Sequence, residues 1–133
     1  MNNFEKVKNS GYRLTGPRRK ILASLADKPI TVQEIALSLK KKRIDIDTVS
    51  IYRSMELFMK MKIVQALDIG DGKRRYELVD QHNHHHHLIC NKCGSIEDIK
   101  MNEKMLLKPL TNKSHFKVDH HHLEFFGLCA KCQ

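Results

Sequence analysis

The sequence has no cysteine outside two Cys-x-x-Cys pairs, no long apolar run and no histidine before His82. Its apolar runs all fall short of the ~20 residues that a membrane-spanning helix needs. The opening stretch, MNNFEKVKNSGYRL, lacks the apolar core of a secretory signal peptide. We therefore expect a cytoplasmic protein that contacts no membrane and whose thiols stay reduced.

The two pairs, Cys90/Cys93 and Cys129/Cys132, contain every cysteine of the chain. Each pair can turn two thiolates toward one point, and four thiolates complete the tetrahedral shell of a structural zinc ion. Two disulfides or two redox pairs are the alternative, but they need an oxidising compartment, and nothing here suggests export. A shared zinc site requires the two pairs to meet in space.

Charge and histidine divide the 133-residue chain into two halves of different chemistry. Residues 1–78 carry 17 Lys and Arg against nine Asp and Glu, whereas residues 79–133 carry seven against six. All nine histidines lie in the second half. We therefore expect two small domains joined by a hinge at residues 79–83. The basic half suggests a polyanionic partner, with a merely solvated basic surface as the alternative.

The first half has the element order of a winged helix-turn-helix. Apolar spacing favours a short helix over residues 1–10, and Thr15 and Thr31 can N-cap two further helices. Asp45 or Asp47 can cap a fourth helix that ends near residue 59. Its apolar residues recur every three positions: Val49, Tyr52, Met55 and Phe58, with Ile51 beside them. Strands at 63–67 and 75–78 would form the wing.

This plan predicts a DNA-binding domain over residues 1–78. The fourth helix would enter the major groove, and basic residues of the second helix and wing would contact phosphates. Tyr52 can rest on a thymine methyl or belong to the core, and Arg53 can reach a phosphate or a guanine edge. The candidates are Arg13, Arg18, Arg19, Thr48, Ser50, Tyr52, Arg53, Lys73 and Arg74, with Ser54 as a further exposed position.

The second half, residues 84–133, is rich in metal-ligating side chains. On a strand, His85 and His87 would point to one face and His84 and His86 to the other, which allows two separate metal sites. In a second cluster, His121 would likewise lie opposite His120 and His122. A solvated polar strand end is the alternative for either cluster.

The expected fold class is α+β, with the winged helix followed by a small α/β dimerisation domain. Strands at 96–99 and 117–126 complete a three-stranded sheet that carries the four-cysteine zinc site. A helix at 102–114 would turn Met105, Leu106 and Leu110 inward, with Pro109 as a kink position. Because DNA half-sites are commonly read by two-fold dimers, we expect self-association through this sheet.

Several segments resemble the ferric uptake regulator superfamily. The matching stretches are GYRLTGPRRKIL, DTVSIYRSMELF, DGKRRYEL, HHHHLICNKCGSIED, HHHLEFFGLC and the final CAKC. The resemblance implies a homodimeric transcription factor, usually a repressor, that binds an A/T-rich palindrome in double-stranded DNA when a divalent metal fills a regulatory site.

The resemblance also implies ligand sets. Cys90, Cys93, Cys129 and Cys132 would hold structural zinc, and Glu77, His85 and His87 the regulatory ion. His84, His86 and His121 would form an additional site with Glu103, whose register is offset from the family's glutamate. Pro29 stands where the family often has a regulatory histidine, so His82 is a candidate replacement. His86 stands where some iron-type members have an aspartate, which makes its site richer in nitrogen.

The regulatory metal implied by the resemblance is iron(II) or zinc, with manganese as a further option. Zinc-sensing relatives often add a cysteine that this chain lacks, and peroxide-sensing relatives favour aspartate where Glu77 stands. A peroxide-responsive regulator and a metal-storage or delivery protein that binds no DNA remain alternatives. An enzyme is not expected, because four cysteines close the zinc site and no His-x-Glu with a following Pro-Cys-x-x-Cys occurs.

Overall fold

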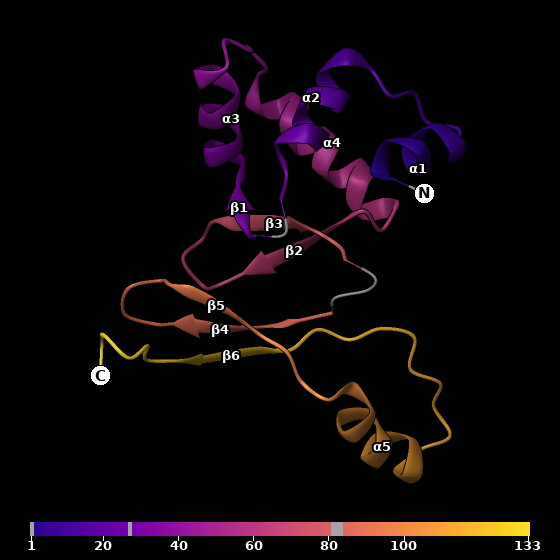
Figure 1. The fold of residues 1–133 in the computed structure, drawn as a ribbon, viewed down its shortest axis with the longest axis vertical. Coiled ribbons are helices and arrows are strands. Elements are labelled where there is room, and N and C mark those ends of the chain that lie inside the picture. The colour runs from indigo at the N-terminus through magenta and orange to yellow at the C-terminus, as the bar shows by residue number, and fades with distance from the viewer. Residues whose placement is uncertain (1, 27, 81–83) are drawn as a thin grey trace. The chain divides into compact units, whose positions relative to one another are not determined.

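The computed structural model describes residues 2–26, 28–80 and 84–133, and the chain divides into two compact units, Met1–Asp80 and Gln81–Gln133 (Figure 1). Each unit has its own three-stranded sheet, in the order β1-β3-β2 in the first and β5-β4-β6 in the second. The expected α+β fold class, with a winged helix-turn-helix and a second small domain, is confirmed.

Four helices of the first unit begin at polar N-caps. They are α1 (Asn3–Asn9), α2 (Gly16–Ser24), α3 (Val32–Lys41) and α4 (Thr48–Lys60). Thr15 caps α2, and Thr31 forms a capping box with Glu34 at α3. Asp47 rather than Asp45 caps α4, where its carboxylate accepts from the Ser50 backbone N–H at 3.1 Å and the Ser50 hydroxyl at 2.6 Å. These caps satisfy amide groups that a helix start leaves unpaired.

The wing of the first unit is an antiparallel hairpin of β2 (Val64–Asp68) and β3 (Arg74–Leu78). A short strand, β1 (Ile30–Thr31), pairs with the other edge of β3 and was not expected from the sequence. Two residues are too short for an alternation pattern, so only the pairing in space reveals this strand. β1 leads directly into α3 and therefore ties the helices to the wing.

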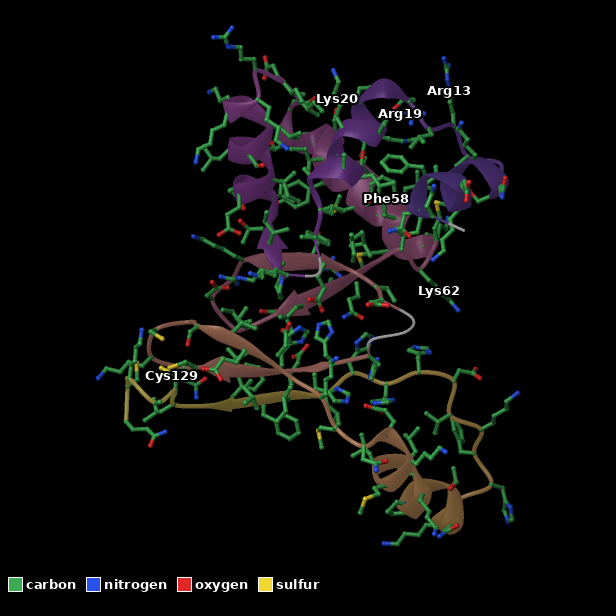
Figure 2. The ribbon with its side chains drawn as sticks, in the orientation of Figure 1. Arg13, Arg19, Lys20, Phe58, Lys62 and Cys129 are labelled. Atoms are coloured by element: carbon green, nitrogen blue, oxygen red, sulfur yellow. The ribbon has the colours of Figure 1, made fainter. Side chains whose placement is uncertain are left out.

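The core of the first unit lies between its helices and the wing sheet. It includes Ile21 and Ile35, Phe58 among the helices (Figure 2), and Tyr76 from β3. On α4, Ile51, Met55 and Phe58 are buried, whereas Val49 and Tyr52 are exposed. A three-residue repeat drifts around a helix of 3.6 residues per turn, so the repeat cannot stay on one face. The alternative that placed Tyr52 in the core is wrong, and Ser54, expected to be exposed, is buried.

The second unit consists of β4 (His86–Cys90), β5 (Ile96–Ile99), α5 (Glu103–Lys113) and β6 (Glu124–Gly127). β4 lies in the centre, antiparallel to β5 and parallel to β6. The strand expected over residues 117–126 forms only at Glu124–Gly127. The strand ladder pairs His87 with Glu124, and Leu123 C=O still accepts from His87 N–H at 3.5 Å. Because β4 begins at His86, residues before Leu123 lie beyond the start of this strand and have no β4 residue opposite them.

The expectation that three apolar residues of α5 point inward was also wrong in part. Met105 is 73 % exposed and Leu110 is 54 % exposed, and no residue of α5 is buried. The helix therefore packs no apolar face into the core of its own unit. Within the described residues, no helix is both long and apolar enough to cross a lipid bilayer.

Candidate metal centres and DNA-binding surface

The four cysteines meet at one end of the second sheet, where Figure 2 labels Cys129. Their Sγ atoms all lie within 4.8 Å of one another. β4 and β6 run parallel, with Cys90 paired with Gly127, so both strands deliver their cysteines to the same edge. Each pair sits on a tight turn: Gly94 N–H donates to Cys90 C=O at 2.9 Å, and Cys132 N–H donates to Cys129 C=O at 3.0 Å.

The sulfur spacing suits a zinc ion. The Sγ atoms of Cys93 and Cys129 are 3.7 Å apart. A Zn–S bond of about 2.3 Å gives a tetrahedron whose edges are about 3.8 Å long. The same four residues are free thiols in the structure. The donor set therefore fits a closed, tetrahedral zinc site.

The surroundings of this cluster favour the thiolate form of Cys90 and Cys93 and oppose that of Cys132. Backbone N–H groups of Cys129 and Cys93 lower the pKa of Cys90 to about 6. The hydroxyl and backbone N–H of Ser95 lower the pKa of Cys93. In contrast, the neighbouring thiols of Cys129 and Cys93, together with burial, raise the pKa of Cys132 to about 12. Four thiolates at this spacing repel one another, and a divalent cation is the charge that would stabilise all of them.

A second cluster joins three histidines to a carboxylate from α5. The ligand atoms of His84, His86, Glu103 and His121 all lie within 4.8 Å of one another. Glu103 Oε1 lies 2.8 Å from His86 Nε2, and Oε2 lies 2.8 Å from His121 Nε2. Glu103 reaches the cluster from the first turn of α5, which Asn102 caps. The structure thus brings together the residues expected for the additional site.

The contacts in this cluster fit a bound cation better than hydrogen bonds alone. Glu103 Oε2 is buried and accepts no hydrogen bond from any described residue. His121 Nε2 lies 2.8 Å away, but the two groups are not in hydrogen-bond geometry. The Nε2 atoms of His84 and His121 face each other at 3.3 Å. Burial would raise the pKa of Glu103, but the hydrogen bond from His86 and the nearby imidazoles lower it overall. Nitrogen and carboxylate ligands that converge in this way suit a divalent transition metal.

The opposite face of β4 carries the other two histidines, as alternation predicts. His85 and His87 have ring centroids 5.1 Å apart. Asp98 Oδ1 lies 3.9 Å from His85 Nε2 and 3.8 Å from His87 Nε2. Sequence reasoning missed Asp98. The feature that could have located it is the hairpin around Cys90 and Cys93, because the register of this hairpin pairs His87 with Asp98.

Glu77, expected to join His85 and His87, lies on β3 of the first unit and is fully buried. Its partner across the ladder is Gln65, whose side-chain N–H donates to Glu77 Oε1 at 2.6 Å. A buried carboxylate with a fixed amide partner has a defined orientation, as metal ligands commonly do. His82, the candidate replacement at the regulatory site, lies outside the described residues.

The expected DNA-binding residues divide into exposed and structurally engaged positions. Thr48, Tyr52, Arg53, Lys73 and Arg74 are exposed, and Ser50 is half-buried at the α4 cap. Arg13 and Lys20 extend outwards from the first unit (Figure 2). Arg18 donates to Arg13 C=O at 2.7 Å, and the Arg19 guanidinium lies 5.5 Å from the centroid of the Phe4 ring. These two arginines therefore also organise the start of α2.

The wing turn is fixed by an ion pair that sequence reasoning did not identify. Arg75 donates to both carboxylate oxygens of Asp71, at 3.0 and 2.9 Å. The Arg75 guanidinium holds the pKa of Asp71 at about 2. Asp71 also accepts from the Lys73 backbone N–H at 3.1 Å. This turn presents the exposed Lys73 and Arg74, while Arg75 is engaged within the wing.

The first unit is a winged helix with exposed basic residues, and the second gathers cysteines and histidines in clusters that fit a cation. This combination is typical of metal-responsive DNA-binding regulators. Comparison with known proteins narrows this class. The model of the Ferric uptake regulator family matches residues 9–126, and the chain belongs to this family. It is a metal-responsive transcriptional regulator of the Fur type, and the expected family membership is confirmed.

The relatives cover almost the whole chain. The ferric uptake regulation protein of Neisseria meningitidis serogroup A is 31 % identical over 99 % of this chain and 94 % of its own length. The peroxide-responsive repressor PerR of Staphylococcus aureus is 32 % identical over 98 % of this chain and 89 % of its own. The crystal structure of the Vibrio cholerae ferric uptake regulator has a TM-score of 0.82 at 29 % identity, covering 96 % of this chain and all of that one.

Proposed function

We propose that this protein is a metal-dependent repressor that binds an A/T-rich palindromic operator as a homodimer and controls genes of iron or zinc homeostasis. The observation that carries the proposal is the division of the histidines between the two faces of β4. One chain joins a DNA-binding fold to a strand whose opposite faces hold two separate imidazole–carboxylate groups. A cation at either group would distinguish a metal-bound form of the regulator from a metal-free form.

Cys90, Cys93, Cys129 and Cys132 would hold a structural zinc ion. The role is structural because four protein ligands leave no open position for substrate or water. Among the described residues of the second unit, only Ile89 and Cys90 are buried apolar side chains. A unit with so thin a core needs another source of stability. A zinc site supplies folding free energy directly.

His85, His87 and Asp98 would hold the regulatory cation together with Glu77. The support is the convergence of Asp98 on both imidazoles and the fixed, buried carboxylate of Glu77. Glu77 precedes the linker at residues 79–83 and His85 follows it. When bound, the cation would join ligands on both sides of this linker and so favour one arrangement of the domains, which couples metal to DNA affinity.

Asp98 would supply the ligand that is missing at position 29, where a proline stands in place of the family's histidine. The family's histidine would come from the DNA-binding domain, whereas Asp98 comes from the strand next to β4. With Asp98, three of the four proposed ligands come from residues 85–98, and His82 is not required. His84, His86, Glu103 and His121 would hold the additional cation.

The donor sets favour different ions at the two exchangeable sites. Two carboxylates and two imidazoles at the regulatory site suit iron(II) and manganese as well as zinc. Three imidazoles and one carboxylate at the additional site shift preference toward zinc. We propose iron(II) or zinc as the physiological regulatory ion.

Self-association would cover the exposed apolar side chains of the second unit. Phe125, Phe126 and Leu128 are 42, 51 and 52 % exposed. They line a hollow of about 280 Å³ beside the cysteine cluster. Exposed aromatic side chains grouped on a sheet are typical of protein interfaces. A second copy of the chain would also bring two recognition helices to the two halves of a palindrome.

DNA binding across a metal series tests the proposal. Purified protein would be titrated with Fe²⁺, Mn²⁺ or Zn²⁺ and mixed with a duplex selected from a random-sequence library. We expect a dimer to bind an A/T-rich palindrome only when metal is present. A storage or delivery protein would take up the same metals and shift no duplex, and that result would refute the proposal.

A peroxide-responsive repressor is the second candidate, favoured by the 32 % identity to the Staphylococcus aureus PerR. The test is intact-mass analysis after exposure of the Fe²⁺-loaded protein to hydrogen peroxide under limiting dose. Oxygen added to His85 or His87, with loss of DNA binding, would support peroxide sensing. Unmodified histidines and retained binding would favour a sensor of the metal alone.

A further inference from the structure

Two apolar side chains, Val49 and Tyr52, lie on the solvent-facing side of α4 near its N-terminus. Val49 lies in the first turn of this helix and is 54 % exposed. Since a helix turns by roughly 100° per residue, Val49 lies roughly opposite the buried Ile51 and Phe58. Its nearest neighbours on the same side are Tyr52, three positions on, and Arg53, four positions on. The N-terminal part of this exposed side therefore combines an apolar pair with a cation, and the exposed Glu56 and Lys60 follow farther along the helix.

A role for Val49 in folding does not explain this position. The side chain is not part of the hydrophobic core, and the helix start is already capped by Asp47, which accepts from Ser50. Valine is also a weaker helix former than alanine because its branched side chain loses rotamer freedom. A single exposed apolar residue needs no explanation, but here the neighbouring Tyr52 is also 41 % exposed. The pair forms a small apolar surface near the N-terminus of α4.

We propose that Val49 is a specificity-determining residue that packs against the C5-methyl group of thymine in the operator. The inference rests on the proposed function, because it requires α4 to lie in the major groove. N-terminal residues of a recognition helix contact base edges, and the thymine methyl is the one apolar group that the major groove displays. Arg53 beside Val49 supplies the charge that holds the helix against DNA.

Replacing single thymines by uracil provides the test, because uracil pairs identically and lacks only the methyl group. The probe is the duplex that metal-loaded wild-type protein selects from a random library. For wild type, we expect uracil at one or two thymines per half-site to weaken binding by about threefold to tenfold. Val49→Ala should bind the thymine duplex more weakly by a similar factor and show no further loss, within about twofold, at those thymines.

Leu37→Ala is the matched control, since Leu37 is an exposed apolar residue, at 60 %, on α3. It should retain the wild-type pattern of uracil penalties. Thermal melting should show that both variants remain folded, so a loss confined to particular thymines cannot come from unfolding.

The outcomes separate this inference from the proposed function. If wild type binds the selected duplex but Val49→Ala keeps every uracil penalty, Val49 contacts no thymine methyl and this inference alone is wrong. Tyr52 would then account for the penalties. If wild type binds no duplex with any metal, the proposed function is wrong and the inference falls with it.

Discussion

At the scale of single residues, the proposed metal ligands depend on partners that sequence periodicity does not reveal. Glu77 is a fully buried carboxylate whose oxygen accepts from Gln65. The histidine pattern was predictable, because strand alternation sends neighbouring imidazoles to opposite faces. Asp98 was not, since its place beside His87 depends on the length of the cysteine turn between β4 and β5. Long-range register, rather than local pattern, decides which carboxylates complete such sites.

Replacing Gln65 with leucine should destabilise the first unit even without metal. The change removes the amide N–H that donates to buried Glu77 at 2.6 Å, and a hydrogen bond to a charged group contributes about 1.5–3 kcal/mol. Urea unfolding followed by circular dichroism would measure this loss. Gln33→Leu, an exposed position on α3, is the control and should change stability by less than about 0.5 kcal/mol. Equal stability of the two variants would show that the Gln65–Glu77 bond contributes nothing.

Asp98→Asn should weaken the regulatory site while leaving the sheet intact. The substitution preserves size but removes the carboxylate beside His85 and His87, so affinity for Zn²⁺ or Mn²⁺ should fall by about tenfold or more. Competition with a chromogenic chelator measures this affinity without DNA. The control is Glu97→Gln, one residue earlier on β5 and therefore on the opposite face. An unchanged affinity in Asp98→Asn would remove Asp98 from the ligand set.

At the scale of elements, helix starts were the most predictable features and strand ends the least. Thr15 and Thr31 cap helices through contacts within three residues, so sequence alone located them. The strand expected at 117–126 is shorter because residues before Leu123 lie beyond the start of β4 and have no residue opposite them. Met105 and Leu110, which were expected to point inward from α5, are exposed, whereas Leu106 is half-buried, and no residue of this helix is fully buried. Local hydrogen bonds are encoded locally, whereas strand length and helix burial depend on distant neighbours.

The wing turn should respond to acid in a way that depends on Arg75. Because Asp71 has a folded pKa of about 2, below its ordinary 3.8, the ion pair contributes stability above pH of about 4. That contribution is lost as pH falls through about 2. NMR titration should therefore place the Asp71 midpoint near pH 2 in wild type and near 4 in Arg75→Gln. Arg74→Gln removes the same charge one residue away and should leave the Asp71 midpoint near 2.

The same pair should matter for DNA, because the turn that Asp71 and Arg75 hold presents Lys73 and Arg74. Arg75→Gln should weaken binding on all duplexes alike, since phosphate contacts carry no sequence information. A loss restricted to particular base pairs would instead make Arg75 a base-reading residue.

At the scale of the whole molecule, the two units differ in what stabilises them. The first has a core that runs from Val7 to Tyr76, whereas the described part of the second buries only Ile89 and Cys90 among its apolar residues. The sequence anticipated this contrast, because its cysteines and histidines gather where apolar periodicity is weakest. The proposed zinc site at the cysteine cluster would therefore take the place of a large core in the second unit.

Cys93→Ser should for this reason unfold the second unit and leave the first one folded. Structural zinc contributes about 10–16 kcal/mol in small zinc-folded peptides, which exceeds what so thin a core can replace. NMR spectra should retain dispersed signals from residues 2–80 and lose those from 84–133, and sedimentation should show monomers. Ser95→Ala is the control, because it removes the Cys93 partner at 3.2 Å but keeps all four thiols. It should stay folded and dimeric. A folded, dimeric Cys93→Ser protein would show that the apolar contacts of β4, β5 and β6 suffice without the fourth thiolate.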